Sequence, residues 1–282
     1  MMQLQTRARA VAFAASLVLT QLLNAADHGP LFGLATPTNP KGGWSVDLGI
    51  NGRSRTASNL EAELTYGLTQ NIKLAVSGPV VFRPDPYPRS SVTTNTPIGG
   101  DFSGLTWWRF QKKDFAGKRV ESTAVAGVLV PGPQLETGIY KGLNSGLGYM
   151  VGGVTGIASR SQYVWVGASY QRYAESKGDR RPDLLSYTAV YGYRPLSWRT
   201  DYPRWDWRVF GEFTGERTGG LQRQKFEIPG SQAKQMFLGP SMLGVYRAIA
   251  VEAGIQFPVY RDAGPLYPKE RYRFALNFAY FF

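Results

Sequence analysis

Apolar and polar residues alternate along most of the chain beyond its first forty residues. In the stretch WSVDLGIN, residues 44–51, large apolar side chains occupy every second position. A period of two is the pattern of a β-strand that buries one face. No helical period of useful length appears in this part of the chain.

About twelve such segments can be placed, and most are ten residues or slightly longer, the length of a tilted membrane-spanning strand. They cover residues 43–53, 59–68, 71–82, 102–112, 119–130, 146–158, 161–173, 184–194, 204–216, 234–246, 248–259 and 270–282. The two faces are hard to distinguish in 146–158 and 161–173, where glycine and aromatic residues interrupt the alternation.

The connections between these segments alternate in length. Residues 69–70, 159–160 and 247 form tight turns, whereas 83–101 and 217–233 are long polar loops. Short turns at one end and long loops at the other are typical of membrane barrels. The sequence therefore predicts an all-β protein, a transmembrane antiparallel up-and-down β-barrel of about 12 strands.

A soluble β-sandwich is the alternative fold, because its strands alternate in the same way. Sandwich strands are typically shorter, about six residues. The strong aromatic content, 16 Tyr, 15 Phe and 7 Trp, would also crowd the core of a sandwich. Both features favour the barrel.

The first residues form a separate unit. Arg7 and Arg9 precede the apolar run AVAFAASLVLTQLL, which ends before small residues suited to signal peptidase. The run is too short to cross a bilayer as a helix. We therefore expect a signal peptide over 1–26, cleaved after Ala25 or Ala26. Residues 27–42 would be a periplasmic or lumen segment, and 43–282 the outer-membrane barrel.

The chain ends RYRFALNFAYFF, residues 271–282, an amphipathic strand where many proteins have a frayed tail. This end resembles the export signature of outer-membrane barrels. We expect Tyr280 and Phe282 to engage the barrel assembly machinery, and the strand to close the barrel against 43–53.

The formal net charge is +12 and the chain has no cysteine. The basic residues are spread thinly, without the runs that are typical of nucleic-acid binding. For an exported protein, outer-membrane lipid and lipopolysaccharide are the expected anionic partners, and we expect no nucleic acid. A large barrel needs no disulfide framework.

The polar face of each strand should point into the barrel, since lipid contacts the apolar face. Aromatic residues near the strand ends, such as Trp44, Trp108 and Trp205, fit the interfacial girdles. Candidate lumen-lining residues are Asp47, Arg53, Glu61, Glu63, Lys73, Arg109, Glu121, Arg194, Asp206, Arg208, Glu212, Glu252, Arg273 and Asn277. Two interpretations remain open, a salt-bridged structural lumen and a charged permeation path.

Little in the sequence indicates catalysis. The single histidine, His28, lies outside the strands, so a histidine-based hydrolase on the barrel is not expected. Glu61 and Glu63 are a formal carboxylate pair, better explained as partners of Lys73 or Arg53. If cleavage follows Ala25, the new N-terminal amine of Ala26 and the His28 side chain could bind Cu(II) or Ni(II) together with two backbone amides. We expect no cofactor and no enzyme activity.

Three stretches carry a family resemblance: HGPLFGLATPT at 28–38, KGGWSVDLG at 41–49 and LTYGLTQNIKLAVSGPVV at 64–81. Together with the terminal Phe282, they resemble outer-membrane barrels grouped with the meta-pathway phenol-degradation transporters. The resemblance covers most of the mature chain and offers no catalytic residues. It implies passage of a small, hydrophobic or aromatic solute.

The sequence thus favours an outer-membrane channel or transporter for a small solute. The alternative is a non-conducting structural barrel with a salt-bridged lumen, whose loops 83–101 and 217–233 bind a partner.

Overall fold

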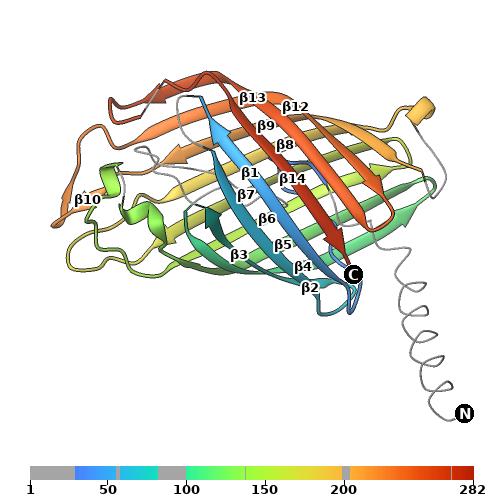
Figure 1. Ribbon diagram of the computed structural model, residues 1–282, viewed down its shortest axis with the longest axis horizontal. Helices are drawn as coiled ribbons and strands as arrows, with labels where there is room; N and C mark the ends of the chain where they lie inside the picture. The colour runs from blue at the N-terminus through green and yellow to red at the C-terminus, as the bar shows by residue number, and fades with distance from the viewer. Residues whose placement is uncertain (1–28, 55–57, 82–99, 137, 199–203, 268) are drawn as a thin grey trace, which may run out of the picture.

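The computed structural model describes residues 29–54, 58–81, 100–136, 138–198, 204–267 and 269–282. Twelve strands form a closed barrel in the order β1-β14-β13-β12-β9-β8-β7-β6-β5-β4-β3-β2, with every neighbouring pair antiparallel. Figure 1 shows the strands tilted around a common axis. The predicted fold class is therefore confirmed.

The strands follow the predicted segments closely. Their bounds are β1 Trp44–Arg53, β2 Asn59–Gly67, β3 Ile72–Val81, β4 Phe102–Phe115, β5 Lys118–Val130, β6 Gly148–Ser159, β7 Gln162–Tyr173, β8 Leu184–Tyr193, β9 Asp206–Thr218, β12 Ala233–Tyr246, β13 Ile249–Ala263 and β14 Arg273–Phe281. The clearest differences are that β4 and β13 run three to four residues further than predicted, and β14 starts three residues later. β4 extends because residues 111–115 keep pairing with β5 across a short turn at Ala116 and Gly117.

Some of the connections have structure that the pattern did not predict. A small hairpin, β10 Gln222–Arg223 and β11 Phe226–Glu227, lies within the predicted loop 217–233. Three short 3-10 turns occur at η1 Pro133–Glu136, η2 Gly138–Tyr140 and η3 Leu196–Trp198. Within the described part of the chain, no helix is long and apolar enough to cross a membrane.

The first and last strands close the barrel, as predicted. Residues 45–53 of β1 pair with 281–273 of β14. The backbone nitrogen of Trp44 donates to the carbonyl of Phe282 (2.9 Å), and the nitrogen of Phe282 donates to the carbonyl of Trp44 (3.0 Å). Closure leaves no unpaired edge in the ring.

The two faces of the wall are reversed relative to a soluble protein. Apolar side chains such as Val76, 63 % exposed, and Leu276, 43 % exposed, point outward, while polar residues such as Glu61 and Glu252 are buried inside. An apolar exterior is what a bilayer requires. Because no soluble sheet would expose such a surface over its whole circumference, the barrel has the architecture of a membrane-spanning protein.

The barrel has two different ends. We call the end with the C-terminus and the short turns the turn end, and the end with η1, η2 and the β10–β11 hairpin the loop end (Figure 1). Aromatic side chains lie at the turn end. The centroid of the Trp44 ring is 4.5 Å from that of Tyr66, and Trp44 stacks on Phe282 at a centroid distance of 6.5 Å. Trp108 and Trp205 are exposed on the outer wall as well.

Candidate functional site: the barrel interior

Residues 29–40 lie inside the barrel, and the chain enters it from the turn end at Lys41 and Gly42, which are exposed. The Gly42 nitrogen donates to the Gly67 carbonyl (2.7 Å), and the Gly67 nitrogen donates to the Gly43 carbonyl (2.9 Å). Gly42 has a φ of 78°, a left-handed conformation that glycine adopts without strain. At Gly67 a Cβ would lie 1.9 Å from the Pro40 carbonyl oxygen. These glycines let the chain turn sharply at the rim and pass inward. We call residues 29–40 the inner segment.

The tip of the inner segment is held by one carboxylate. Glu212, on β9 and 0 % exposed, accepts hydrogen bonds from the backbone nitrogens of Leu31 (2.8 Å), Phe32 (2.8 Å) and Gly33 (2.7 Å). The hydroxyl of Ser241 on β12 donates to the same carboxylate. Consecutive backbone N–H groups form a concave anion site, and bonds to an ionised acceptor are stronger than neutral ones. Glu212 therefore holds this segment at its turn.

Apolar contacts support the same tip. Leu31 and Phe32 are buried against Ala275 of β14, and Phe32 lies over Gly254 of β13. Leu34 is 0 % exposed and packs with the apolar cluster of the inner wall. Burying such side chains is a large favourable term, about 1.5–3 kcal/mol each. The inner segment is thus packed as part of the core.

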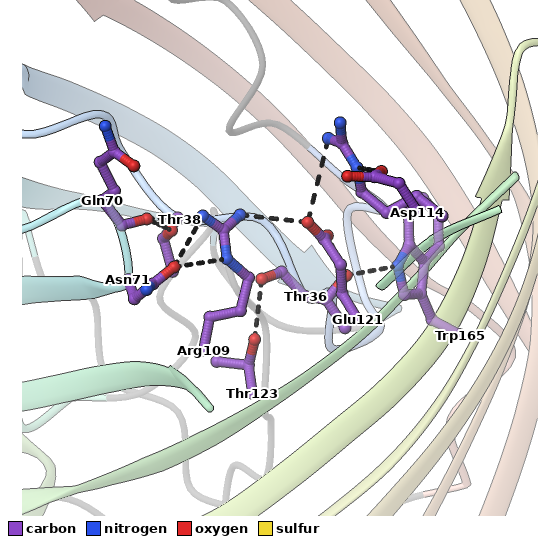
Figure 2. Close-up of polar contacts among 10 residues, drawn as sticks. Thr36, Thr38, Gln70, Asn71, Arg109, Asp114, Glu121, Thr123 and Trp165 are labelled. Carbon is purple, nitrogen blue, oxygen red and sulfur yellow. Dashed lines mark hydrogen bonds and ion pairs between the residues drawn. The ribbon is translucent and has the colours of Figure 1, made fainter. Parts of the chain in front are cut away.

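The middle of the segment is held by a polar cluster near the turn end (Figure 2). The Thr36 hydroxyl donates to Glu121 (3.1 Å) and accepts from the Trp165 indole nitrogen (3.1 Å). The Thr123 hydroxyl donates to the Thr36 carbonyl (2.8 Å). Thr36 therefore connects β5 and β7 through the interior.

Arg109 extends this cluster to the rim of the barrel. Its guanidinium pairs with Glu121 (3.1 Å) and donates to the Gln70 carbonyl (2.5 Å) and the Asn71 side chain, as Figure 2 shows. The Thr38 hydroxyl donates to the same Gln70 carbonyl (3.1 Å). The turn between β2 and β3 is in this way tied to both the inner segment and β4.

One part of the inner wall is apolar, which the sequence did not predict. Strands β4 to β9 direct Trp107, Val154, Trp165, Val190 and Phe210 inward, where they pack with Leu34. Tyr163 stacks on Trp165 at 5.5 Å, and Trp165 lies 6.3 Å from Phe210. The inner face is apolar here because the wall packs against a folded segment and not against water alone.

The opposite part of the wall is polar. Asn277 on β14 donates to Asp47 on β1 (3.1 Å) and to Glu252 on β13 (3.2 Å). Glu61 and Glu63 on β2 and Lys73 on β3 are buried on the same side, with the Lys73 ammonium 5.3 Å from the centre of the Trp107 ring. The interior therefore has one aromatic and one hydrogen-bonding side.

An ion-pair network spans the interior near the loop end. Arg273 binds Glu216 through two nitrogens (2.6 and 3.1 Å) and Glu270 through a third (2.7 Å), while Arg53 pairs with Glu270. Burial alone would raise the pKa of the Glu270 carboxyl, but Arg273 and Arg53 outweigh it and lower that pKa to about 2. Glu270 thus stays ionised although it is buried.

The loops above this network are tied to one another. Asp179 accepts hydrogen bonds from the backbone (2.9 Å) and side chain (3.0 Å) of Asn144 and from the backbone of Gln224 (2.8 Å). These bonds lower the pKa of the Asp179 carboxyl. One side chain therefore joins three connections of the loop end. Arg181 lies beneath them, paired with Asp101 (2.6 Å) and 4.2 Å from the Tyr173 ring.

All the lumen candidates named from the sequence lie on the inner face. Asp47, Arg53, Glu61, Glu63, Lys73, Glu121, Glu212, Glu252, Arg273 and Asn277 are buried, and Arg109, Arg194, Asp206 and Arg208 are partly exposed. Among the partly exposed ones, Asp206 pairs with Arg194 (2.5 Å) and Arg208 (3.1 Å). The buried candidates contact other residues of the protein, and two of them, Glu121 and Glu212, accept hydrogen bonds from the inner segment. His28 lies outside the described residues, and the described residues hold no cluster of three or more potential metal ligands.

Sequence reasoning did not find the inner segment as a binding element or the inward aromatic residues. One signal was available. Residues 29–40 contain Leu31, Phe32 and Leu34 but no charged side chain, a composition that favours burial over a hydrated linker.

Comparison with known proteins supports the fold. The sequence matches no protein-family model and none of the curated protein sequences. Among solved structures, the barrel is similar to the COG4313 outer membrane channel from Pseudomonas putida F1, with a TM-score of 0.61 at 12 % identity, over 91 % of this chain and 99 % of that one. LpxR from Salmonella typhimurium has a TM-score of 0.44 at 11 % identity, over 84 % of this chain and 100 % of that one. The channel DcaP of Acinetobacter baumannii has a TM-score of 0.33 at 12 % identity, over 80 % and 63 %. At 12 % identity the likeness to the COG4313 channel shows the fold alone, that of an outer-membrane β-barrel.

Proposed function

We propose that this protein is a channel of the Gram-negative outer membrane and that residues 29–40 close it at rest. The observation that carries the proposal is the inner segment itself. It has no charge of its own and enters from one end. Along the barrel it is held by hydrogen bonds to the side chains of Glu212, Glu121 and Thr188 and by apolar packing, and not by a strand ladder. Such contacts can be released without unfolding any strand.

The turn end would face the periplasm, because short turns lie on that side of outer-membrane barrels. The inner segment would then leave toward the periplasm, where it is continuous with Gly42 and Gly43. No strand pairing needs to break for this movement, since the ladder of β1 begins at Trp44.

The composition of the wall next to the inner segment favours a small apolar or aromatic molecule as the transported solute. When Leu34 withdraws, it uncovers Trp165, Phe210 and Val190, which form an aromatic and aliphatic side of the interior. A solute with a ring and a few polar groups fits between this side and the polar side at Asp47 and Asn277. The resemblance to phenol-degradation transporters points to the same class of solute.

Three further assignments belong to this proposal. Tyr280 and Phe282 would engage the barrel assembly machinery, and the loop end would contact lipopolysaccharide. We propose no enzyme activity, in keeping with a chain that has one histidine and no cysteine.

The test is conductance in planar bilayers, with wild-type protein and a variant that lacks residues 29–40. We expect wild type to be mostly closed with rare openings, and the deletion variant to show frequent, discrete openings. Flux of a phenol into liposomes should rise in parallel. Arg160→Gln, a change at an exposed residue of the β6–β7 turn outside the interior, is the control and should behave as wild type.

A non-conducting barrel that binds a partner is the second candidate, favoured by the way Asp179 joins the outer loops. If the folded deletion variant neither conducts nor passes solute, the channel proposal fails and this candidate takes its place. Part of the predicted binding surface, loop 83–101, lies outside the described residues except at its end.

A further inference from the structure

A groove of about 500 Å³ lies on the outer wall of the barrel at the turn end, apart from the interior. It is lined by Ser197, Trp198, Arg204, Trp205, Trp207 and Met242. The first four belong to the connection between β8 and β9, and the last two to the outward faces of β9 and β12. The volume lies within the ~300–1,000 Å³ typical of ligand sites.

The floor of the groove is aromatic and firmly built. Trp205 stacks on Trp207 at 5.3 Å and on Tyr246 at 5.4 Å. Trp207 lies flat over its cross-strand partner Gly244, where a Cβ would come within 2.4 Å of the indole ring. A side chain at position 244 would lift this ring, so glycine keeps the shelf flat.

The groove changes character along the barrel axis. Its polar members, Arg204 and Ser197, lie in the connection beyond the strand ends. Met242 lies four residues inside the end of β12, which places it up to ~13 Å further toward the centre of the bilayer. The indoles stand between the two, as they do at membrane interfaces. A ligand that fits this groove has an anionic head group at the rim and an apolar tail that runs along the outer wall toward the centre of the bilayer.

We propose that this groove binds one phospholipid of the periplasmic leaflet, with its phosphate on Arg204 and an acyl chain along Trp198, Trp207 and Met242. The Arg204 guanidinium is exposed and suited to bidentate phosphate contacts. Leu196, 73 % exposed on η3, adds an apolar side chain beside the groove. The short turn η3 and Arg204 thereby become lipid-binding parts of the rim, which explains why Leu196 and Trp198 are apolar residues in a turn.

Native mass spectrometry of the delipidated, folded protein tests the proposal, with phosphatidylglycerol and a diacylglycerol of the same chains as probes. Wild type should retain one phosphatidylglycerol. Arg204→Gln should lower the affinity for phosphatidylglycerol about tenfold, because one charge-assisted contact is lost. It should leave the affinity for diacylglycerol unchanged. Trp198→Ala should lower the affinity for both lipids.

Matched controls are Arg160→Gln, an exposed arginine in the β6–β7 turn, and Trp108→Ala, an exposed indole on β4. Both should bind as wild type. The proposal is overturned if Arg204→Gln binds phosphatidylglycerol normally, or if the controls lose as much affinity as the groove variants. Resistance to SDS unfolding without heating establishes that each variant is folded before its affinity is compared.

Discussion

The carboxylate of Glu212 accepts a hydrogen bond from the backbone nitrogen of Gly33 at 2.7 Å, across 179 residues of sequence. At Gly33 a Cβ would lie 2.3 Å from the Val190 side chain. The inner segment therefore reaches this carboxylate only because glycine allows its backbone to approach the wall. Two neighbouring N–H groups share the same acceptor, so this point holds the segment most directly.

Glu212→Gln should loosen the tip of the inner segment. The amide that replaces one carboxylate oxygen presents hydrogens to the backbone N–H groups and removes the charge that strengthens their bonds. We expect amide hydrogen exchange at Leu31, Phe32 and Gly33 to accelerate at least about tenfold. Asp206→Asn should leave these rates unchanged, and equal rates in Glu212→Gln and wild type would contradict the role assigned to Glu212.

Gly67→Ala should displace the base of the inner segment. Its Cβ would meet the Pro40 backbone carbonyl at 1.9 Å, a contact that cannot be relieved by a side-chain rotation. We expect trypsin to cleave after Lys41 several times faster than in wild type. Gly104→Ala is the control, because its Cβ has only an ordinary contact, 3.7 Å from Val128. Equal cleavage of the two variants would show that the rim tolerates the displacement.

Arg273→Met should destabilise the barrel by about 3–5 kcal/mol, because it leaves Glu216 and Glu270 buried without their shared cation. Urea unfolding in lipid vesicles measures this change. Arg119→Met breaks the exposed pair with Asp114 and should cost about 1 kcal/mol or less. Adding Glu216→Gln and Glu270→Gln to Arg273→Met should restore part of the lost stability. The Arg273 guanidinium also lies 3.7 Å from the centre of the Phe237 ring, and no recovery would mean that the loss of this contact accounts for the change.

Acid should weaken the loop end through Glu270. Its pKa in the folded protein is about 2, below the ordinary value of 4.5, so the unfolded chain binds its proton first as the pH falls. The stabilisation is fully present above about pH 4.5 and is lost between about pH 4.5 and 2. We expect the urea midpoint to fall over this range, and less steeply in Glu270→Gln. Parallel curves for the two proteins would exclude Glu270 as the source.

Much of the fold could be predicted because strand periodicity is a local property. Each strand of the barrel repeats every two residues, and turns such as Thr69–Gln70 carry their own signal. Strand β6 was harder, since glycine at 148, 152, 153 and 156 leaves the inner face without a polar pattern. The phase of 204–216 places Phe210 on the inner face with Arg208 and Glu212, but the packing of Phe210 with Trp165 and Leu34 depends on what fills the lumen, which no single strand encodes.

The contacts of the inner segment could not be predicted for a related reason. Thr36 meets Glu121 and Trp165, which lie on strands far away in the sequence. Such pairings depend on how the closed barrel positions the three elements together. The phase of each strand placed Glu121 and Glu212 on the inner face, but it gave no partner for either.

The hydrogen bonds between Trp44 and Phe282 also have a consequence for the order of assembly. The inner segment runs directly into β1, and β1 forms one side of the seam that the last strand completes. Because β14 comes after the other eleven barrel strands in the chain and pairs with β1, the ring can close only when all of them have been made. The inner segment and the β1–β14 seam are therefore both attached to β1. A mispairing at Trp44 would displace the seam and the base of the inner segment together.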